Sequence, residues 1–256
     1  MIEIDINKLS REYKNKIAVD SLTLKINKGE LFSLLGTNGA GKTTTIKMLS
    51  TLIRPTSGKV KIEDYDLEKD KMKIKEIINV SPQETAIASN LTVLENLKFM
   101  AGVYKISNKK EKINELIEEF RLEEVLKQKA KTLSGGWQRK LSIAISLINS
   151  PKILFLDEPT LGLDVISRQE LWQVINRLKG KMTIILTTHY MEEAESLSDK
   201  VGIMDKGKLI ALGTPNELIK QAGTEKFEEA FIKLVTKRGD KQWEYSIWQI
   251  ETLKKL

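Results

Sequence analysis

The sequence predicts an α/β fold in which a mixed sheet surrounds a phosphate-binding loop and carries a helical insertion. The first observation is a glycine-rich segment, residues 36–43, between an apolar run and a helical pattern. The second is an apolar strand at 153–156, a helical pattern at 166–178 and another apolar strand at 184–186, an order typical of a parallel sheet. The third is the stretch 92–148, whose pattern is almost entirely helical.

The N-terminal region has the alternation of half-buried strands. Apolar and polar residues alternate around Ile2, Ile4 and Ile6, and again around Leu22, Leu24 and Ile26. The pair Lys28-Gly29 predicts a turn into the apolar strand 31–35, and residues 58–63 predict a further strand after the first helix.

Residues 36–43 read Gly-Thr-Asn-Gly-Ala-Gly-Lys-Thr, the pattern of a phosphate loop. Glycines let backbone N–H groups approach phosphates, and the helix after the loop points the positive end of its dipole at the same anion. Lys42 would reach the β- and γ-phosphates, and the Thr43 hydroxyl would hold Mg²⁺. A chance glycine-rich turn is the alternative, but the flanking strand and helix favour a nucleoside triphosphate site. Its expected residues are Gly36, Thr37, Asn38, Gly39, Ala40, Gly41, Lys42, Thr43 and Thr44.

The helical insertion contains a second candidate anion site. One helix face is predicted from the spacing of Ile113, Leu116, Ile117 and Phe120. Further on, Ser134, Gly135 and Gly136 open a helix that is expected to continue to Pro151. A capped, glycine-rich helix N-terminus can bind an anion, although a simple loop and cap would have the same pattern.

Two carboxylates follow the apolar strand 153–156. Asp157 and Glu158 would lie at the carboxyl end of a buried parallel strand, where ligands of α/β sheets bind. There, Asp157 can hold Mg²⁺ through water and Glu158 can polarise an attacking water. A helix cap is the alternative, and the phosphate loop upstream favours the catalytic interpretation.

The C-terminal region includes a predicted hairpin of residues 201–205 and 208–212. A capping box at 214–217, with proline at the first helical position, starts a short helix that Gly223 ends. Beyond it, an apolar stripe and an aromatic tail are expected to pack on their own domain, to contact a second subunit or to rest at a membrane interface. The stripe is Phe227, Ala230, Phe231 and Leu234, and the tail is Trp243, Tyr245, Ile247, Trp248, Ile250 and Leu253.

Composition excludes several classes of site and location. The 256 residues include no cysteine and one histidine, which excludes disulfides, Cys-based zinc sites and multi-His metal sites. Apolar stretches such as 141–148 fall short of the roughly 18 residues of a membrane span. Glu3 and Asp5 do not fit a signal peptide, so a cytosolic location is expected. The net charge of +7 permits nucleic acid or an anionic membrane as partners, but interleaved acids favour a solvated mixed surface, and no nucleic acid is expected.

Taken in order, these segments resemble the ATP-binding cassette (ABC) family over about residues 2–223. The resemblance implies a domain at 1–223, with an antiparallel β subdomain and a helical subdomain at about 84–150, and a C-terminal extension at 224–256. The matching segments are the Walker A loop at 36–43, the signature at 133–138, Walker B at 153–158, the D-loop at 161–164, the switch histidine His189 and the Q-loop glutamine Gln83. The chain departs from the common family pattern at Thr37, Trp137 and Leu161.

The resemblance also implies roles for individual residues. Two subunits would form a head-to-tail dimer, with each ATP held between the Walker A loop of one subunit and the signature residues Ser134, Gly135 and Gly136 of the other. Glu158 would act as base or orient the water, while His189 would contact the γ-phosphate. Gln83, with Thr43 and Asp157, would sense or hold Mg²⁺, and Tyr13 would stack on adenine. For Tyr13 and His189 the alternatives are surface packing and a purely structural role.

The implied function is the ATPase subunit of an exporter, acting as a homodimer with integral membrane permease subunits supplied in trans. Residues 158–164 and 188–195 are most similar to daunorubicin-resistance-type exporter ATPases, which implies a peripheral location on the inner face of the cell membrane. The alternatives are a soluble ABC ATPase acting on ribosomes or DNA and a nucleotide-binding regulator without catalysis. One phosphate loop and no sustained heptad repeat argue against the former, and the intact Glu158 and His189 argue against the latter.

Overall fold

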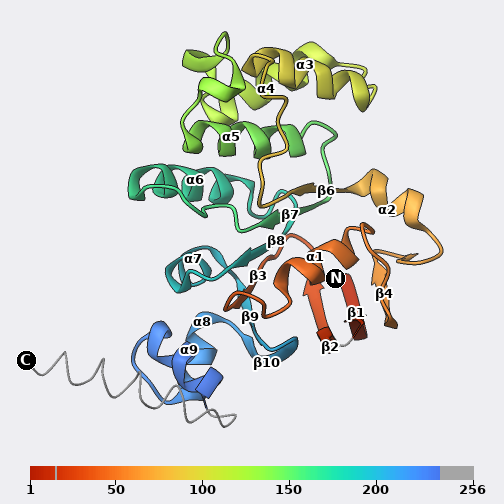
Figure 1. Ribbon diagram of the computed structural model, residues 1–256, viewed down its shortest axis with the longest axis vertical. Helices are drawn as coiled ribbons and strands as arrows, with labels where there is room; N and C mark the ends of the chain where they lie inside the picture. Colours follow the sequence, from red (N-terminus) through yellow and green to blue (C-terminus); the bar gives the residue numbers. More distant parts are fainter. Residues whose placement is uncertain (15, 237–256) are drawn as a thin grey trace, which may run out of the picture.

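The computed structural model describes residues 1–14 and 16–236, which form two sheets and several groups of helices (Figure 1). The helices α3, α4 and α5 lie at one end of the long axis, and α8 and α9 lie toward the other. The strands are β1 (Ile2–Tyr13), β2 (Lys16–Asn27), β3 (Leu31–Gly36), β4 (Ser57–Ile62), β5 (Tyr65–Asp66), β6 (Ile78–Ser81), β7 (Ile153–Asp157), β8 (Thr183–Thr188), β9 (Lys200–Asp205) and β10 (Lys208–Gly213). The α-helices are α1 (Lys42–Leu49), α2 (Lys71–Ile77), α3 (Val93–Val103), α4 (Lys109–Phe120), α5 (Gly135–Ser146), α6 (Val165–Leu178), α7 (Met191–Leu197), α8 (Pro215–Ala222) and α9 (Phe227–Thr236).

A mixed six-stranded sheet forms the centre, in the order β10-β9-β3-β8-β7-β6. Strands β3, β6, β7, β8 and β9 pair in parallel, and β10 returns antiparallel to β9 as the predicted hairpin. Every residue of β3, β7 and β8 is buried, as expected for strands that are covered on both faces. Because parallel strands end at the same edge, the residues that follow β3, β7 and β8 are brought together there.

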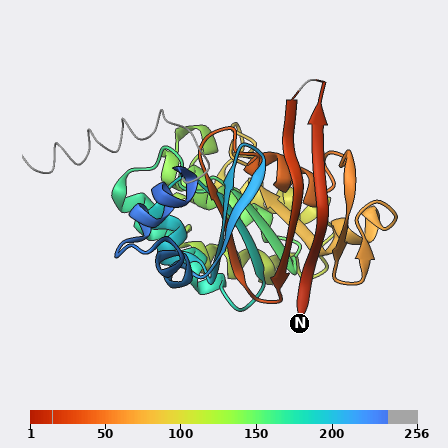
Figure 2. The same cartoon turned by 90° about the horizontal axis from the view of Figure 1, so that it is seen from below.

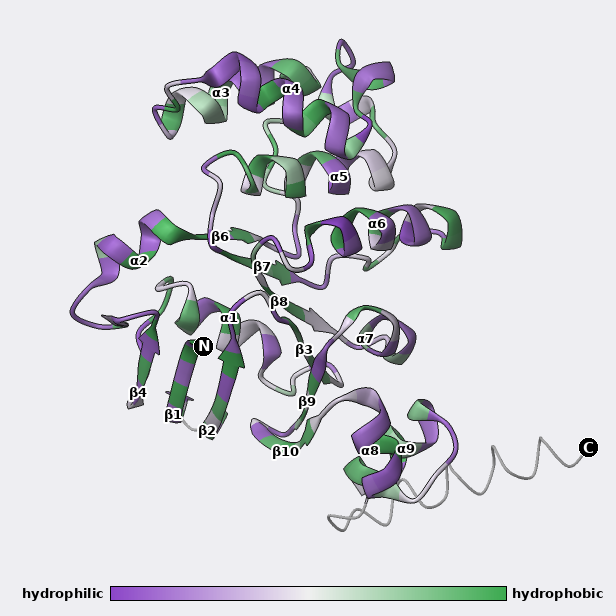
Figure 3. Cartoon of the chain, turned by 180° about the vertical axis from the view of Figure 1, so that it is seen from behind, coloured by the Kyte–Doolittle hydropathy of each residue, from purple (hydrophilic) through white to green (hydrophobic). Residues whose placement is uncertain are grey.

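A second sheet is antiparallel and has the order β2-β1-β4-β5. Strands β1 and β2 form a long ribbon beside the central sheet (Figure 2). Their hydropathy alternates along the chain, whereas β7 is mostly hydrophobic (Figure 3). Apolar side chains from β1, β2 and β4 share one core with α1 and with one face of the central sheet, so the antiparallel sheet holds α1 in place.

The helical insertion packs against α6 and the other face of the central sheet through a second core. The predicted face of α4 is confirmed, since Ile113, Leu116 and Phe120 are buried. The expectation that α5 continues to Pro151 is wrong, because the helix ends at Ser146. After the helix, backbone hydrogen bonds join residues three apart: Ile148 N–H donates to the Ile145 carbonyl, and Ser150 N–H donates to the Leu147 carbonyl. Pro151 lacks an N–H and disfavours helical geometry in the residue before it.

The C-terminal elements follow the prediction as far as the structure describes them. The capping box joins Thr214 and Glu217, and Gly223 takes the left-handed conformation that ends α8. On α9, Phe227 and Ala230 are buried against the same domain, and Phe231 and Leu234 are packed beside them. The apolar stripe is therefore covered by its own domain. The aromatic tail, 243–253, lies outside the described residues.

Within residues 1–14 and 16–236, no helix has the length and apolar character needed to cross a bilayer.

Candidate functional site

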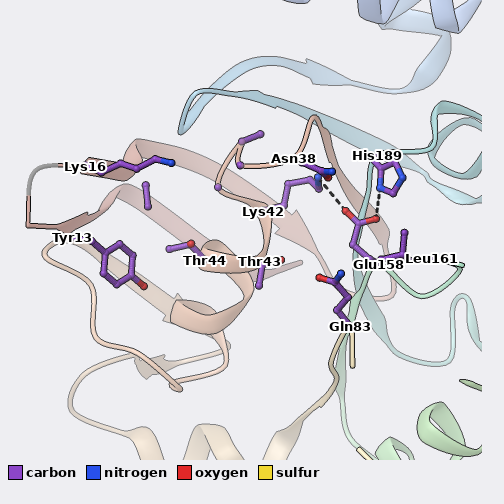
Figure 4. Close-up of a pocket in the computed structure, with 14 residues that line it drawn as sticks. Tyr13, Lys16, Asn38, Lys42, Thr43, Thr44, Gln83, Glu158, Leu161 and His189 are labelled. Atoms are coloured by element: carbon purple, nitrogen blue, oxygen red, sulfur yellow. Dashed lines mark hydrogen bonds and ion pairs between the residues drawn. The ribbon is translucent and has the colours of Figure 1, made fainter. Parts of the chain in front are cut away.

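A cavity of about 530 Å³ opens at the carboxyl ends of β3, β7 and β8, beside the N-terminus of α1. Tyr13 and Lys16 lie at one end of it, and Glu158 and His189 lie at the other (Figure 4). Most of the residues predicted for the nucleotide site therefore meet in one place. The lining residues are Tyr13, Lys16, Ala18, Asn38, Gly39, Ala40, Gly41, Lys42, Thr43, Thr44, Gln83, Glu158, Leu161 and His189.

The phosphate loop has a geometry that requires glycine at Gly41. This residue caps α1 with φ of 103°, and a Cβ there would lie 2.4 Å from the Ala18 carbonyl oxygen. The loop can therefore turn tightly into α1 against β2. The N–H groups of the first turn of α1 and the positive end of its dipole face the cavity, which suits an anion.

The Lys42 side chain is only 5% exposed and lies across the cavity floor. Its Nζ donates hydrogen bonds to the carbonyl oxygens of Gly36, at 2.7 Å, and Thr37, at 3.2 Å. It also lies 3.1 Å from Glu158 Oε1, as an ion pair. The ammonium is thus held at the loop by three oxygens, one of them charged.

Glu158 stands between two basic groups. One carboxylate oxygen pairs with Lys42, and the other lies 2.7 Å from His189 Nδ1 (Figure 4). Glu158 has φ of 49°, and its N–H donates to both the carbonyl and the hydroxyl oxygen of Thr187, at 3.1 and 3.0 Å. A non-glycine residue in this region is strained by roughly 1–3 kcal/mol, and such strain is concentrated at functional sites.

Asp157 and Thr43 form the part of the site suited to a cation. Asp157 Oδ1 accepts hydrogen bonds from the hydroxyls of Thr43, at 3.0 Å, and Thr187, at 2.6 Å. Among the residues that the structure describes, no group of three or more His, Cys, Asp or Glu side chains forms a metal cluster. A Mg²⁺ ion fits these donors, because proteins commonly supply it with one or two carboxylates while water and substrate phosphates complete its shell.

The signature residues do not line this cavity. Ser134 stands at the N-cap of α5, where its side chain makes no capping hydrogen bond, and Gly135 and Gly136 begin the helix. A Cβ on Gly136 would lie 2.7 Å from Ser167 Oγ, so glycine is required for α5 to approach the start of α6. The second predicted anion site therefore belongs to a different surface from the phosphate loop of the same chain.

Tyr13 lies at the far end of the cavity and is 42% exposed. Its ring contacts the Arg11 guanidinium, with 4.5 Å from Cζ to the ring centroid. Lys16 and Ala18, which the sequence did not single out, lie beside it. An exposed aromatic ring at the mouth of a pocket fits either a stacking platform for a planar ligand or surface packing.

Two buried charged residues near the site were not predicted from the sequence. Arg139 on α5 is 4% exposed and donates hydrogen bonds to main-chain carbonyls next to Gln83 and Glu158. Glu193 on α7 accepts a hydrogen bond of 3.0 Å from Trp172 Nε1, and burial raises the pKa of its carboxyl. The sequence gives only one sign that Arg139 could be buried, which is its position as a charged residue in an apolar helical pattern.

Sequence similarity to known proteins identifies the family of this chain. The sequence model of the family described as "ABC transporter" matches residues 19–161. The "Probable multidrug ABC transporter ATP-binding protein YbhF" of Escherichia coli is 38% identical over 240 residues, covering 91% of this chain and 41% of YbhF. The "Daunorubicin/doxorubicin resistance ATP-binding protein DrrA" of Streptomyces peucetius is 38% identical, covering 86% of this chain and 68% of DrrA. This chain thus spans less than half the length of YbhF.

A solved structure shows the same arrangement of elements. It is a dimeric post-hydrolysis state of an ATP-binding cassette bound to ADP and phosphate. The superposition has a TM-score of 0.74 at 25% identity and covers 82% of this chain and 98% of that one. The fold of a nucleotide-binding domain of this kind is therefore confirmed.

Proposed function

This chain belongs to the ABC transporter family, and from that premise we propose that it is an ATP-hydrolysing subunit that powers an exporter. The observation that carries the proposal is the arrangement of Lys42, Glu158 and His189 at the phosphate loop. One cavity thus contains a cation that can bind phosphate, a carboxylate that can orient water, and an imidazole. The sequence similarity to DrrA, whose name specifies drug resistance, supports export as the process. We assign residues 1–223 to the ATPase domain and 224–256 to an extension.

Each residue then has a distinct task. Lys42 would exchange its pairing with Glu158 for the β- and γ-phosphates, which offer stronger charge-assisted bonds. Glu158, released by Lys42 but still beside His189, would orient the attacking water. Gln83 lies on the cavity wall, where its amide could contact that water or a cation. Tyr13 would stack on adenine at the far end of the cavity.

The proposal includes Mg²⁺, which the Thr43 hydroxyl and the Asp157 carboxylate would hold. When bound, the ion neutralises charge that develops on the phosphate oxygens. The Thr187 hydroxyl holds Asp157 Oδ1 from the side of β8, so the carboxylate is already oriented.

Hydrolysis would require a second copy of the chain. The phosphate loop and the signature residues Ser134, Gly135 and Gly136 line different surfaces, which supports a head-to-tail dimer in which each site is completed by the other subunit. The exposed apolar residues Leu161, Val165 and Ile166 lie at and after the D-loop, where such a dimer would cover them. The dimeric structure with ADP and phosphate described above supports this assembly.

Lys42→Ala is expected to weaken ATP binding by about 10–100-fold, because a charge-assisted hydrogen bond contributes roughly 1.5–3 kcal/mol. Titration of the purified chain with a fluorescent ATP analogue measures the change. Lys47→Ala is the matched control, since Lys47 is on the same helix and exposed. Equal affinities for Lys42→Ala and the wild type would rule out the assignment of the loop as the phosphate site.

We place the contact with integral membrane subunits beside the edge strand β6, on the cytoplasmic side of the membrane. Phe99 and Val103 on α3 and Tyr104 directly after it are exposed, and Asn79 Nδ2 of β6 donates a hydrogen bond of 3.3 Å to the Tyr104 hydroxyl. Helix α2 flanks the same strand and exposes Met72. An exposed apolar surface of this kind is typical of a protein interface.

Phe99→Glu is expected to abolish co-purification of integral membrane proteins with the tagged chain while its ATP affinity stays within about twofold. A charge at the centre of a desolvated contact loses more than about 2 kcal/mol, or 30-fold in affinity. Leu212→Glu is the control, because Leu212 is exposed on β10 at the opposite edge of the same sheet. Retention of the membrane proteins by Phe99→Glu would place their contact elsewhere.

A further inference from the structure

Arg139 joins three parts of the site that are far apart in the sequence. It lies on α5, one turn after the signature residues, and its side chain is buried. Its Nε donates to the Pro159 carbonyl at 2.8 Å, and Nη2 donates to the Asp157 carbonyl at 2.8 Å. Its Nη1 donates to the carbonyls of Pro82 and Gln83, the latter at 3.3 Å.

These four carbonyls belong to the two segments that present the reactive groups. Asp157 and Pro159 are the residues on either side of Glu158, so Arg139 holds the main chain before and after the catalytic carboxylate. On the other segment, Arg139 holds the main chain of Gln83 itself. The planar guanidinium has five N–H donors in a rigid fork, so its bonds constrain direction as well as distance.

The charge of Arg139 is retained in spite of its burial. Desolvation lowers the pKa of the guanidinium to about 10, and the nearby Asp157, Glu193 and Glu158 partly offset that effect. The group therefore remains cationic at neutral pH. Its four acceptors are neutral carbonyl oxygens. Burial of a cation is costly, and the hydrogen bonds to these four carbonyls offset part of that cost. Arg139 therefore ties the two segments to α5 through bonds that neither segment supplies for itself.

We propose that Arg139 is a positioning residue that transmits contact at the signature segment to Glu158 and Gln83. When the N-terminus of α5 engages the γ-phosphate of a nucleotide bound to the second subunit, α5 and the guanidinium shift together. Through its hydrogen bonds, the guanidinium transmits that shift to the carbonyls on either side of Glu158 and to the carbonyl of Gln83. Hydrolysis is thereby tied to the presence of the second subunit. This inference rests on the proposed ATPase function.

The test compares the steady-state kinetics of Arg139→Lys with those of the wild type, using Mg-ATP and phosphate release. Lysine keeps the charge but lacks the planar fork. We expect kcat to fall by about 100-fold, the loss typical of a small misplacement of catalytic groups. The Kd for ATP should stay close to the wild-type value, because Lys42 and the phosphate loop are untouched.

A second variant, Arg139→Ala, leaves a space that a free guanidinium ion can enter. We expect millimolar, non-denaturing guanidinium to restore part of its kcat without changing its KM. Arg177→Ala is the matched control, because Arg177 is an exposed arginine paired with Glu119, and guanidinium should not raise its rate. Rescue by the free ion distinguishes positioning from a purely structural contribution.

The outcomes separate this inference from the proposed function. A wild-type chain without Mg-ATP hydrolysis would refute the ATPase function itself. An active wild type with an equally active Arg139→Lys would overturn the positioning role alone. Failure of both Arg139 variants to fold, or normal kcat per folded molecule at a lowered melting temperature, would make Arg139 a stability residue and overturn it as well.

Discussion

Replacement of Glu158 by Gln is expected to lower kcat for ATP hydrolysis by about 10²–10⁴-fold, the range in which a positioned general base contributes to catalysis. Glutamine keeps the size and the hydrogen-bonding reach of the side chain but carries no charge and cannot accept a proton from water. Lys42 also loses its anionic partner, which favours its interaction with phosphate. Bound ATP should therefore persist, and the dimer that holds it should accumulate.

Phosphate release and gel filtration with Mg-ATP at high protein concentration measure the two effects. Glu229→Gln is the control, because Glu229 is exposed on α9 and away from the cavity. A Glu158→Gln protein that remains monomeric with ATP and hydrolyses it at the wild-type rate would refute the role of Glu158 and the dimer together.

Replacement of His189 by Ala is expected to lower kcat by about 100-fold with little change in ATP affinity. His189 Nδ1 lies 2.7 Å from Glu158 Oε2, so the imidazole fixes the carboxylate on the side away from Lys42. Loss of an oriented hydrogen-bonding partner in a catalytic site typically costs about 10²–10³ in rate. The His189 side chain is 28% exposed, so we expect a small effect on the melting temperature.

Single-turnover hydrolysis, nucleotide titration and thermal melting separate these quantities for His189→Ala. Tyr190→Phe is the control: the Tyr190 ring packs against His189, with 4.1 Å between centroids, and the substitution keeps that contact. A His189→Ala protein with a strongly lowered melting temperature but normal specific activity would identify His189 as a structural residue.

Much of the fold was predictable because its signals are local. The phosphate loop at 36–43 requires glycine where Gly41 turns into α1, and apolar runs such as 153–156 are typical of strands buried on both faces in a covered parallel sheet. The capping box at Thr214 and Glu217 likewise acts over a few residues. In each case one segment contains both the pattern and its physical cause, so the expectation did not depend on the rest of the chain.

The end of α5 was not predictable from periodicity alone. Apolar residues continue through Ile148, and the pattern does not show where the hydrogen-bonding geometry changes before Pro151. The antiparallel strand β5 was also missed, because two residues are too few for a period-two pattern.

The sequence by itself determined the nucleotide site as a set of parts: the loop, the two carboxylates after an apolar strand, the single histidine and the signature. Tertiary structure alone decided how they are arranged. It placed Glu158 between Lys42 and His189, separated the signature from the loop of its own chain, and turned Arg139 inward onto carbonyls of two other segments. Such contacts depend on strand order and on helix packing, which bring residues together across long stretches of chain. No periodicity within a single segment contains that information.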